Sequence, residues 1–367
     1  MKIKALVLAL LATAGAAQAA SSVTLYGQVD VGYEKVQGVS LTQNTYGGGD
    51  TNSRLGLKGQ EDLGNGLAAT FQLEGSFASD TGATSGDSFF SRESTVGLKG
   101  NFGHIRLGRS ASAMERASAD FQVGERIADW NPYASAERYS NALFYDYNYG
   151  GFNFGGNVST KGGYAGNTSE GVSGSKVSYG VFAGYKSAGL NLSAAYQRDN
   201  GTPKSEWFAG ASYTWKALTL GGSYARASHD SRYLFTASNA CVAQQMLNPT
   251  AGIPCTAQYQ PVSVNADVDT TTWQAFAKAA LTSRDDIYLK YMSQKSKMNG
   301  STTITPIMGT ITPTSGSSFS AESKASIWAL GYQHRLSKRT SIYADVARIK
   351  ANDDSSMAWD IALRHKF

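Results

Sequence analysis

The sequence contains few charged residues, few prolines and cysteines, and no long hydrophobic run beyond its N-terminal segment. Charged residues make up 17% of its 367 residues, and only 7 prolines and 2 cysteines are present. A chain with 41% hydrophobic and 11% aromatic residues and so little charge is not intrinsically disordered. The mean hydropathy of −0.29 and the missing apolar runs argue against a bundle of membrane helices. Length alone is typical of two soluble domains, an expectation that the residue pattern does not support.

The N-terminal segment, residues 1–19, has the pattern of a secretory signal peptide. Lys2 and Lys4 form a positive start, a short apolar run follows, and Ala17 and Ala19 supply the small residues that a signal peptidase reads. An uncleaved membrane anchor is the alternative, although the run is shorter than the ~20 residues that a spanning helix needs. Removal of two of the 33 lysines and arginines would leave a single domain, residues 20–367, with 31 basic and 28 acidic residues. So small a net charge on an exported chain gives no support to nucleic-acid binding.

The remaining chain alternates between apolar and polar residues at a spacing of two, which is the pattern of a β-strand with two different faces. Such alternation runs through Val23–Tyr33 and Leu67–Phe77, and no amphipathic helix of ordinary length is apparent after residue 20. The last strand alternates Trp359, Ile361, Leu363 and Phe367 with Asp360, Arg364 and Lys366. The segment Ser91–Gly100 mixes its faces, so its orientation stays open.

Short and long connections alternate between the predicted strands. Seven short and eight longer connections give sixteen strands. The short ones are 63–66, 100–103, 150–151, 187–189, 216–217, 283–284 and 337–338, and the longest polar stretches are 37–51, 79–87, 110–137, 163–174, 231–266 and 297–319. This arrangement is typical of a transmembrane β-barrel, and an even strand number lets the sheet close in lipid. The sequence therefore predicts an all-β fold, a 16-stranded antiparallel transmembrane β-barrel. A secreted all-β repeat protein such as an adhesin is the alternative.

Six stretches resemble the general diffusion porins of Gram-negative bacteria, in particular their β-proteobacterial branch. They are SVTLYG at 22–27, SRLGLKGQEDLG at 53–64, SR at 91–92, VGLKG at 96–100, GHIRLGR at 103–109 and ALRHKF at 362–367. The resemblance implies a cell outer membrane location and a water-filled channel for passive diffusion of ions and small hydrophilic solutes. It also implies a homotrimer in contact with outer-membrane lipid and lipopolysaccharide, and recognition of the strand ending at Phe367 by the barrel-assembly machinery.

The third long connection, Ser110–Glu137, is the candidate for narrowing the lumen. It carries five acidic residues against two basic ones, the acidic residues being Glu115, Asp120, Glu125, Asp129 and Glu137. In the resembling family this loop folds into the barrel and forms the constriction. An external surface loop is the alternative.

A wall of basic residues is expected to face this loop. Position by position, the resemblance matches the family's arginine wall to Arg54, Arg92 and Arg138, and Arg106, Arg109 and Lys58 are further candidates. Arginine stays charged at any relevant pH, and clustered arginines need water and facing carboxylates. Acid on one side of the narrow point and base on the other would create a transverse field, and such fixed charge sets ion selectivity. The sign of that selectivity stays open, because the loop is acidic and the wall is basic.

The cysteines and histidines give no sign of a catalytic or metal centre. Cys241 and Cys255 lie in the sixth long connection, and export to an oxidising compartment favours a loop disulfide, with two free thiols or a metal pair as alternatives. The four histidines lack metal-ligand spacing, and no Gly-x-Ser-x-Gly elbow or phosphate-binding loop occurs. We therefore expect no enzymatic activity, metal or cofactor. An outer-membrane barrel enzyme of lipase or protease type, and an adhesin or phage receptor acting through its surface loops, are the alternative functions.

Overall fold

The computed structural model describes residues 22–36, 42–44, 53–84, 88–128, 133, 137–160, 177–199, 205–235, 262–304 and 318–367. The predicted signal peptide, the loop residue Asp129 and both cysteines, Cys241 and Cys255, lie outside these residues. The leader, the disulfide and the role of Asp129 therefore stay predictions.

The described residues form one antiparallel sheet with short helices. The strands are β1 (Ser22–Val36), β2 (Thr42–Asn44), β3 (Arg54–Gly64), β4 (Leu67–Ser76), β5 (Glu93–Gly100), β6 (Gly103–Ala111), β7 (Arg138–Tyr149), β8 (Phe152–Ser159), β9 (Ser178–Ser187), β10 (Leu190–Arg198), β11 (Ser205–Trp215), β12 (Leu218–Phe235), β13 (Val262–Ala280), β14 (Asp285–Ile304), β15 (Ser318–Arg335), β16 (Thr340–Ala351) and β17 (Asp354–Lys366). The helices α2 (Ala113–Ser118), η3 (Ala119–Phe121) and η4 (Arg126–Ala128) follow β6. None of the helices in the described ranges is long and apolar enough to cross a membrane.

The sheet closes on itself, with β1 paired to β17 at the seam. β2 and β3 both pair with β1, at Gly32–Glu34 and at Ser22–Gln28, so together they occupy one place in a ring of sixteen. The last residue completes the seam, because the N–H of Phe367 donates to the Gly27 carbonyl at 3.1 Å and the N–H of Gly27 donates to the Phe367 carbonyl at 3.2 Å. The prediction of an all-β, 16-stranded antiparallel barrel is confirmed.

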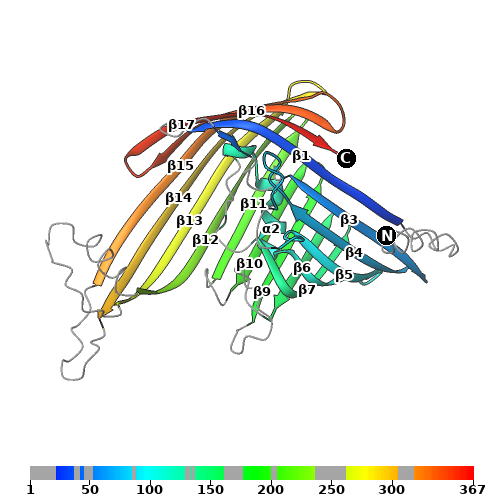
Figure 1. The fold of residues 1–367 in the computed structure, drawn as a ribbon, viewed down its shortest axis with the longest axis horizontal. Coiled ribbons are helices and arrows are strands. Elements are labelled where there is room, and N and C mark those ends of the chain that lie inside the picture. Colours follow the sequence, from blue (N-terminus) through cyan, green and yellow to red (C-terminus); the bar gives the residue numbers. More distant parts are fainter. Residues whose placement is uncertain are drawn as a thin grey trace, which may run out of the picture.

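Short and longer connections alternate around the ring as predicted, except that β16 and β17 are joined by only the two residues Asn352 and Asp353, where a longer connection was predicted. The seven short turns lie at one end of the barrel, which we call the short-turn end, and the other connections lie at the long-connection end. Strands β12–β15 have 18–20 residues and extend well beyond the rest (Figure 1). The polar stretches 231–266 and 297–319 are therefore not loops throughout, since β12 and β13 stay paired as far as Phe235 and Val262. Outside the lipid, strands can pair through their backbones without apolar side chains. The polar ends of these strands were therefore mistaken for loops in the sequence.

Side chains alternate between the exterior and the interior of the barrel. On β17, Trp359 and Leu363 are 44% and 50% exposed, whereas Asp360 and Arg364 are 2% and 5% exposed. β5, whose orientation the sequence left open, places Val96 outside with 61% exposure. An apolar exterior around a polar interior is what a barrel in lipid requires.

The connection between β6 and β7 turns into the barrel. Helix α2 packs on the inner face of β8–β11, η3 reaches β12, and η4 lies against β16 and β17 (Figure 1). Ser112 caps α2, because its Oγ accepts a hydrogen bond from the N–H of Glu115 at 3.1 Å. Met114 and Phe121 are fully buried between the loop and the wall. Residues 112–128 thus form an internal loop rather than an external surface loop.

Candidate functional site

Apolar packing holds the first half of the internal loop. Phe121 joins Phe182 and Phe208 of the inner wall in one buried cluster, and the rings of Phe121 and Phe208 lie 5.7 Å apart. Gly210 of β11 makes room for this ring, because a Cβ there would lie 2.8 Å from its atoms. Beside it, Nε2 of Gln274 donates to the Phe121 carbonyl at 2.6 Å. The glycine at position 210 thus leaves the space on β11 that the Phe121 ring occupies.

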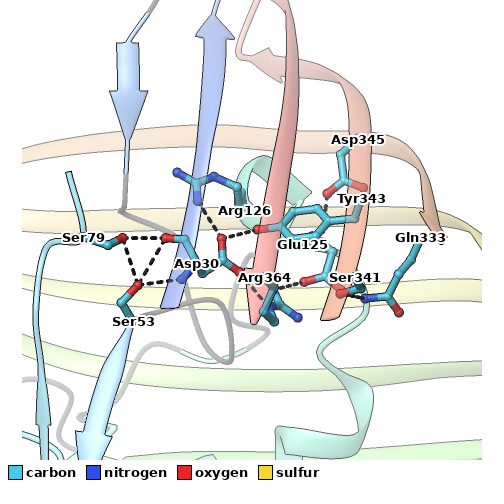
Figure 2. A network of polar contacts seen from close by, with 10 residues as sticks. All are labelled: Asp30, Ser53, Ser79, Glu125, Arg126, Gln333, Ser341, Tyr343, Asp345 and Arg364. Carbon is cyan, nitrogen blue, oxygen red and sulfur yellow. Dashed lines mark hydrogen bonds and ion pairs between the residues drawn. The ribbon is translucent and has the colours of Figure 1, made fainter. Parts of the chain in front are cut away.

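Buried charge holds the second half of the loop. We call Asp30, Glu125, Arg126 and Arg364 the loop anchor (Figure 2). Arg126 donates from Nη1 to Asp30 Oδ1 at 3.0 Å, and both side chains are fully buried. Arg364 donates from Nε to Asp30 Oδ2 and from Nη2 to Glu125 Oε2, each at 2.6 Å. Tyr343 also donates to Asp30 Oδ1 at 2.6 Å. One carboxylate on β1 therefore joins the loop to both strands of the seam and to β16.

Side chains of β14, β16 and β17 also bond the main chain of the loop. The bonds run from the N–H of Glu125 to Asp345 Oδ2 (3.0 Å), from the N–H of Ile127 to Asp360 Oδ2 (3.1 Å) and from Nζ of Lys290 to the carbonyl of Ala128 (3.0 Å). Taking charges out of water is costly unless such bonds compensate. Because the bonded groups are backbone atoms, the arrangement fixes the path of the loop and not just the position of one side chain.

Other charged loop residues bond within the loop or to the neighbouring wall. Glu115 Oε2 accepts from the Tyr133 hydroxyl and from Gln122 Nε2, the latter at 3.2 Å. Burial raises the pKa of the Glu115 carboxyl and holds the pKa of the Tyr133 hydroxyl well above its usual range. Arg116 Nη1 lies 2.5 Å from Asp146 Oδ1 of β7. Glu115 is thus used to hold the loop together, and Arg116 ties it to β7.

Three of the predicted basic residues share the inner face of β3 and β6. Arg54 lies opposite Gln28 in the register, and Lys58 follows on the same side of the pleat. Gln28 is 1% exposed and faces the interior, which places both side chains inside. Arg106 of β6 is buried in the interior, and its Nη2 donates to Asp146 Oδ2 at 2.7 Å.

Two more predicted basic residues are each paired with a carboxylate. Arg92 Nε lies 2.5 Å from Glu74 Oε1, and Arg138 Nη1 lies 2.8 Å from Glu137 Oε2. Glu137, predicted to belong to the acidic loop, therefore bonds the basic wall instead of facing it. The remaining acidic loop residue in the described ranges, Asp120, lies 2.6 Å from Nζ of Lys186, and both side chains are substantially exposed.

Arg109 leaves β6 on the opposite side of the pleat from Arg106, although its guanidinium lies within electrostatic range of Arg138, Glu93 and Glu137. It sits opposite Ser94 and on the same side of the pleat as Leu107, which is 55% exposed on the exterior. Its guanidinium donates to the Ser91 carbonyl at 2.6 Å and to Ser140 Oγ at 2.8 Å. Arg54, Lys58 and Arg106 therefore share the inner face of the wall, whereas Arg109 starts from its outer face.

The site contains acidic residues that the prediction did not include. Glu74, Glu93 and Asp146 lie among the basic side chains, and Glu93 Oε2 is 3.9 Å from Arg106 Nη1. The alternating pattern could have identified such residues. Glu74 and Asp30 lie on the polar faces of clearly alternating strands, and these faces point into the barrel. In the described ranges, no group of three or more His, Cys, Asp or Glu residues could hold a metal ion.

A model for the family described as Gram-negative porin matches residues 5–354. The chain belongs to the Gram-negative porin family. This porin is 30% identical to outer membrane porin protein 32 of Delftia acidovorans, over 97% of this chain and 92% of that protein. It is 27% identical to an outer membrane porin protein of Bordetella pertussis over the full length of both. Its fold is similar to a solved anion-selective porin from Comamonas acidovorans, with a TM-score of 0.64 and 24% identity over 95% of this chain and 100% of that one. The predicted family and outer-membrane location are confirmed.

Proposed function

We propose that this porin is a water-filled channel for passive diffusion of ions and small hydrophilic solutes, with the internal loop as its constriction and no enzymatic activity. One observation carries the proposal: the described loop elements pack on β8–β12 and on β16 and β17. The lumen that stays open therefore lies between the loop and the charged wall of β3–β7. A sixteen-stranded barrel is wide enough to enclose an aqueous channel, so the loop sets the width of the passage.

The charges on the two sides of this passage are fixed in place. The wall side carries Arg54, Lys58, Arg92, Arg106 and Arg138 beside the carboxylates Glu74, Glu93, Glu137 and Asp146. Five cations against four anions leave this wall slightly basic, whereas the loop side presents Asp120 and Glu125. Fixed charge of this kind orients water and selects ions. We expect a weak preference for anions and a barrier to apolar solutes.

Replacing Arg54, Arg92 and Arg138 together with glutamine is expected to shift the reversal potential toward cations. The triple variant loses three cations and leaves Glu74 and Glu137 without the partners that they now bond. Single-channel recording in a neutral planar bilayer with asymmetric salt measures the shift, and stepwise conductance of the parent protein tests the pore itself.

The matched control replaces three exterior cations, Arg226, Lys324 and Arg348, with glutamine. These side chains lie outside the lumen, so we expect the parent's reversal potential. If the lumen triple variant also keeps the parent's reversal potential, these arginines do not line the passage. A purified parent protein without stepwise conductance would refute the channel.

We also propose a homotrimer whose contact surface is the outer face of β3–β7. The exposed residues of this face at mid-height include Leu55, Leu57, Val96, Leu107 and Leu143, and the described strands β3–β7 carry no tryptophan. Strands β11–β17 carry Trp207, Trp273, Trp328 and Trp359 on their exterior. Tryptophan is enriched where a membrane protein meets the lipid interface, so its lack on β3–β7 supports cover of this face by another copy. Unheated protein is expected to migrate as a trimer in SDS gels and as a monomer after boiling. Monomer migration without heating would contradict a stable trimer.

A further inference from the structure

A tyrosine ring lies across the inner wall of the barrel near the start of β1. Tyr26 is two residues from Gln28, which faces the interior, so the pleat places the ring inside as well. A Cβ on Gly56 of β3 would lie 2.5 Å from Cζ of Tyr26, so this glycine leaves the space that the ring occupies. The Tyr26 hydroxyl reaches β4, where Nε2 of Gln72 donates to it at 2.8 Å. The ring is thus held across β3 and remains partly exposed to the lumen.

An ammonium group lies beside this ring. Nζ of Lys58 is 5.0 Å from the centre of the Tyr26 ring, and the Lys58 side chain is exposed in the lumen. Three arginines of the wall, Arg92, Arg106 and Arg138, each lie within 2.8 Å of a carboxylate oxygen. Lys58, in contrast, contacts no carboxylate in the part of the chain that the structure describes. Its charge is therefore available to a solute, whereas the charges of the three arginines are largely neutralised.

We call Tyr26 and Lys58 the lumen pair. Its neighbours in the register are uncharged, because Lys58 lies opposite Thr24 on β1 and opposite Gln72 on β4. Glu74, on the same face of β4, is bound by Arg92 and so repels an arriving anion less than a free carboxylate would. The described loop elements have their main contacts on β8–β12 and on β16 and β17, which leaves the pair facing the passage.

We propose that the lumen pair binds small carboxylates that carry a planar aromatic ring, a class that benzoate represents. This proposal rests on the proposed function, because a solute reaches the pair only through an open lumen. A carboxylate attracts an ammonium group more strongly than a ring face does, and the flexible stem of Lys58 lets its Nζ turn from Tyr26 to the solute. The Tyr26 ring is then free to stack with the ring of the solute in the offset arrangement that aromatic pairs prefer.

The two halves of the pair divide the recognition between charge and ring. Chloride and acetate use only the ammonium group, and a neutral aromatic solute uses only the tyrosine. Binding at an exposed site of this kind is weak, which suits a channel, because a solute that is to pass must also leave.

The test measures single-channel conductance of the full-length protein in a neutral planar bilayer against the concentration of benzoate or acetate. The salts are those of N-methylglucamine, whose large cation carries little of the current. A binding site in the passage makes the conductance saturate. We expect half-saturation in benzoate at a concentration about fivefold lower than in acetate, which is the size of one aromatic contact.

Two variants separate the two halves of the pair. Tyr26→Leu is expected to raise the half-saturating benzoate concentration about fivefold and to leave the acetate value unchanged. Lys58→Gln is expected to raise both values about threefold, as for the loss of an exposed ion pair. The matched control is Lys99→Gln, which removes another exposed cation from the inner face of β5 and is expected to keep both parent values.

A comparison of ligands on the parent protein keeps the test independent of the folding of any variant. Cyclohexanecarboxylate has the charge and approximate size of benzoate but a puckered ring, and we expect it to half-saturate at a concentration about threefold higher than benzoate. Equal values for these two anions, an unchanged benzoate value in Tyr26→Leu, or an equal change in Lys58→Gln and Lys99→Gln would overturn the proposal. Stepwise conductance of the parent in potassium chloride distinguishes each of these results from a failure of the channel itself.

Discussion

Replacing Arg126 with alanine is expected to release the second half of the internal loop and to give a larger, noisier single-channel conductance. The Arg126 guanidinium is completely buried and donates to Asp30, so its removal leaves a buried carboxylate short of one cation. Breaking a buried ion pair costs about 3–5 kcal/mol. We expect the lower end of that range, because Arg364 and Tyr343 still bond Asp30. Single-channel recording and limited proteolysis within residues 112–128 measure the release.

The control for this prediction is an exposed ion pair of the same loop. Lys186→Ala removes the partner of Asp120, where the two side chains are 54% and 42% exposed. Exposed pairs contribute about 0–1 kcal/mol, so the loop of this variant is expected to stay in place, with the parent's current noise and the parent's resistance to proteolysis. Equal conductance changes in the two variants would show that the anchor does not fix the loop.

A double-mutant cycle separates the anchor from a general loss of packing. Asp30→Asn added to Arg126→Ala removes the uncompensated charge, so the double variant is expected to be less destabilised than the two single variants together. Strict additivity of the thermal unfolding changes would mean that Asp30 and Arg126 are not energetically coupled.

The fold was largely predictable because lipid and water impose opposite demands on the two faces of each strand. Alternation of Trp359 and Leu363 with Asp360 and Arg364 identifies a strand and also indicates which face meets lipid. That rule weakens beyond the bilayer, where both faces meet water. The long polar ends of β12–β15 therefore have the sequence pattern of loops.

The period of two also distinguishes the basic residues from one another. Arg54 and Lys58 are four residues apart and share a face, whereas Arg106 and Arg109 are three apart and fall on opposite faces of β6. The sequence analysis added Arg106, Arg109 and Lys58 to the wall as further candidates without applying this check. Spacing alone would have assigned Arg109 to the outer face of β6.

The loop anchor could not be predicted from any local pattern. Asp30 is 96 residues from Arg126 and 334 residues from Arg364 in the sequence. These groups meet because the first and last strands pair and because the loop crosses the interior to reach that seam. The partners of a buried charge in a closed barrel therefore depend on strand register and closure, which single-sequence patterns do not contain.

Replacing Gly27 with valine is expected to prevent correct closure of the barrel. A Cβ at this position would lie 2.4 Å from the Arg54 carbonyl oxygen and 2.7 Å from Cζ of Phe367. The first contact is with the backbone of β3 and the second with the terminal residue whose main chain bonds Gly27, so relief of either clash disturbs one side of β1. Overpacking costs about 1–3 kcal/mol, and we expect roughly the upper value because a backbone atom cannot move aside.

The matched control is Thr24→Val, which introduces the same side chain three residues away on the same strand at an exposed position. The fraction of protein that migrates as folded species in unheated gels, and the midpoint of thermal unfolding, measure both variants. We expect Thr24→Val to behave like the parent and Gly27→Val to show a much smaller folded fraction and a lower midpoint. Equal behaviour of the two variants would mean that β1 can shift between β3 and Phe367 without cost. In that case the strands around Gly27 would move apart enough to accommodate a side chain, and glycine would not be required at this position.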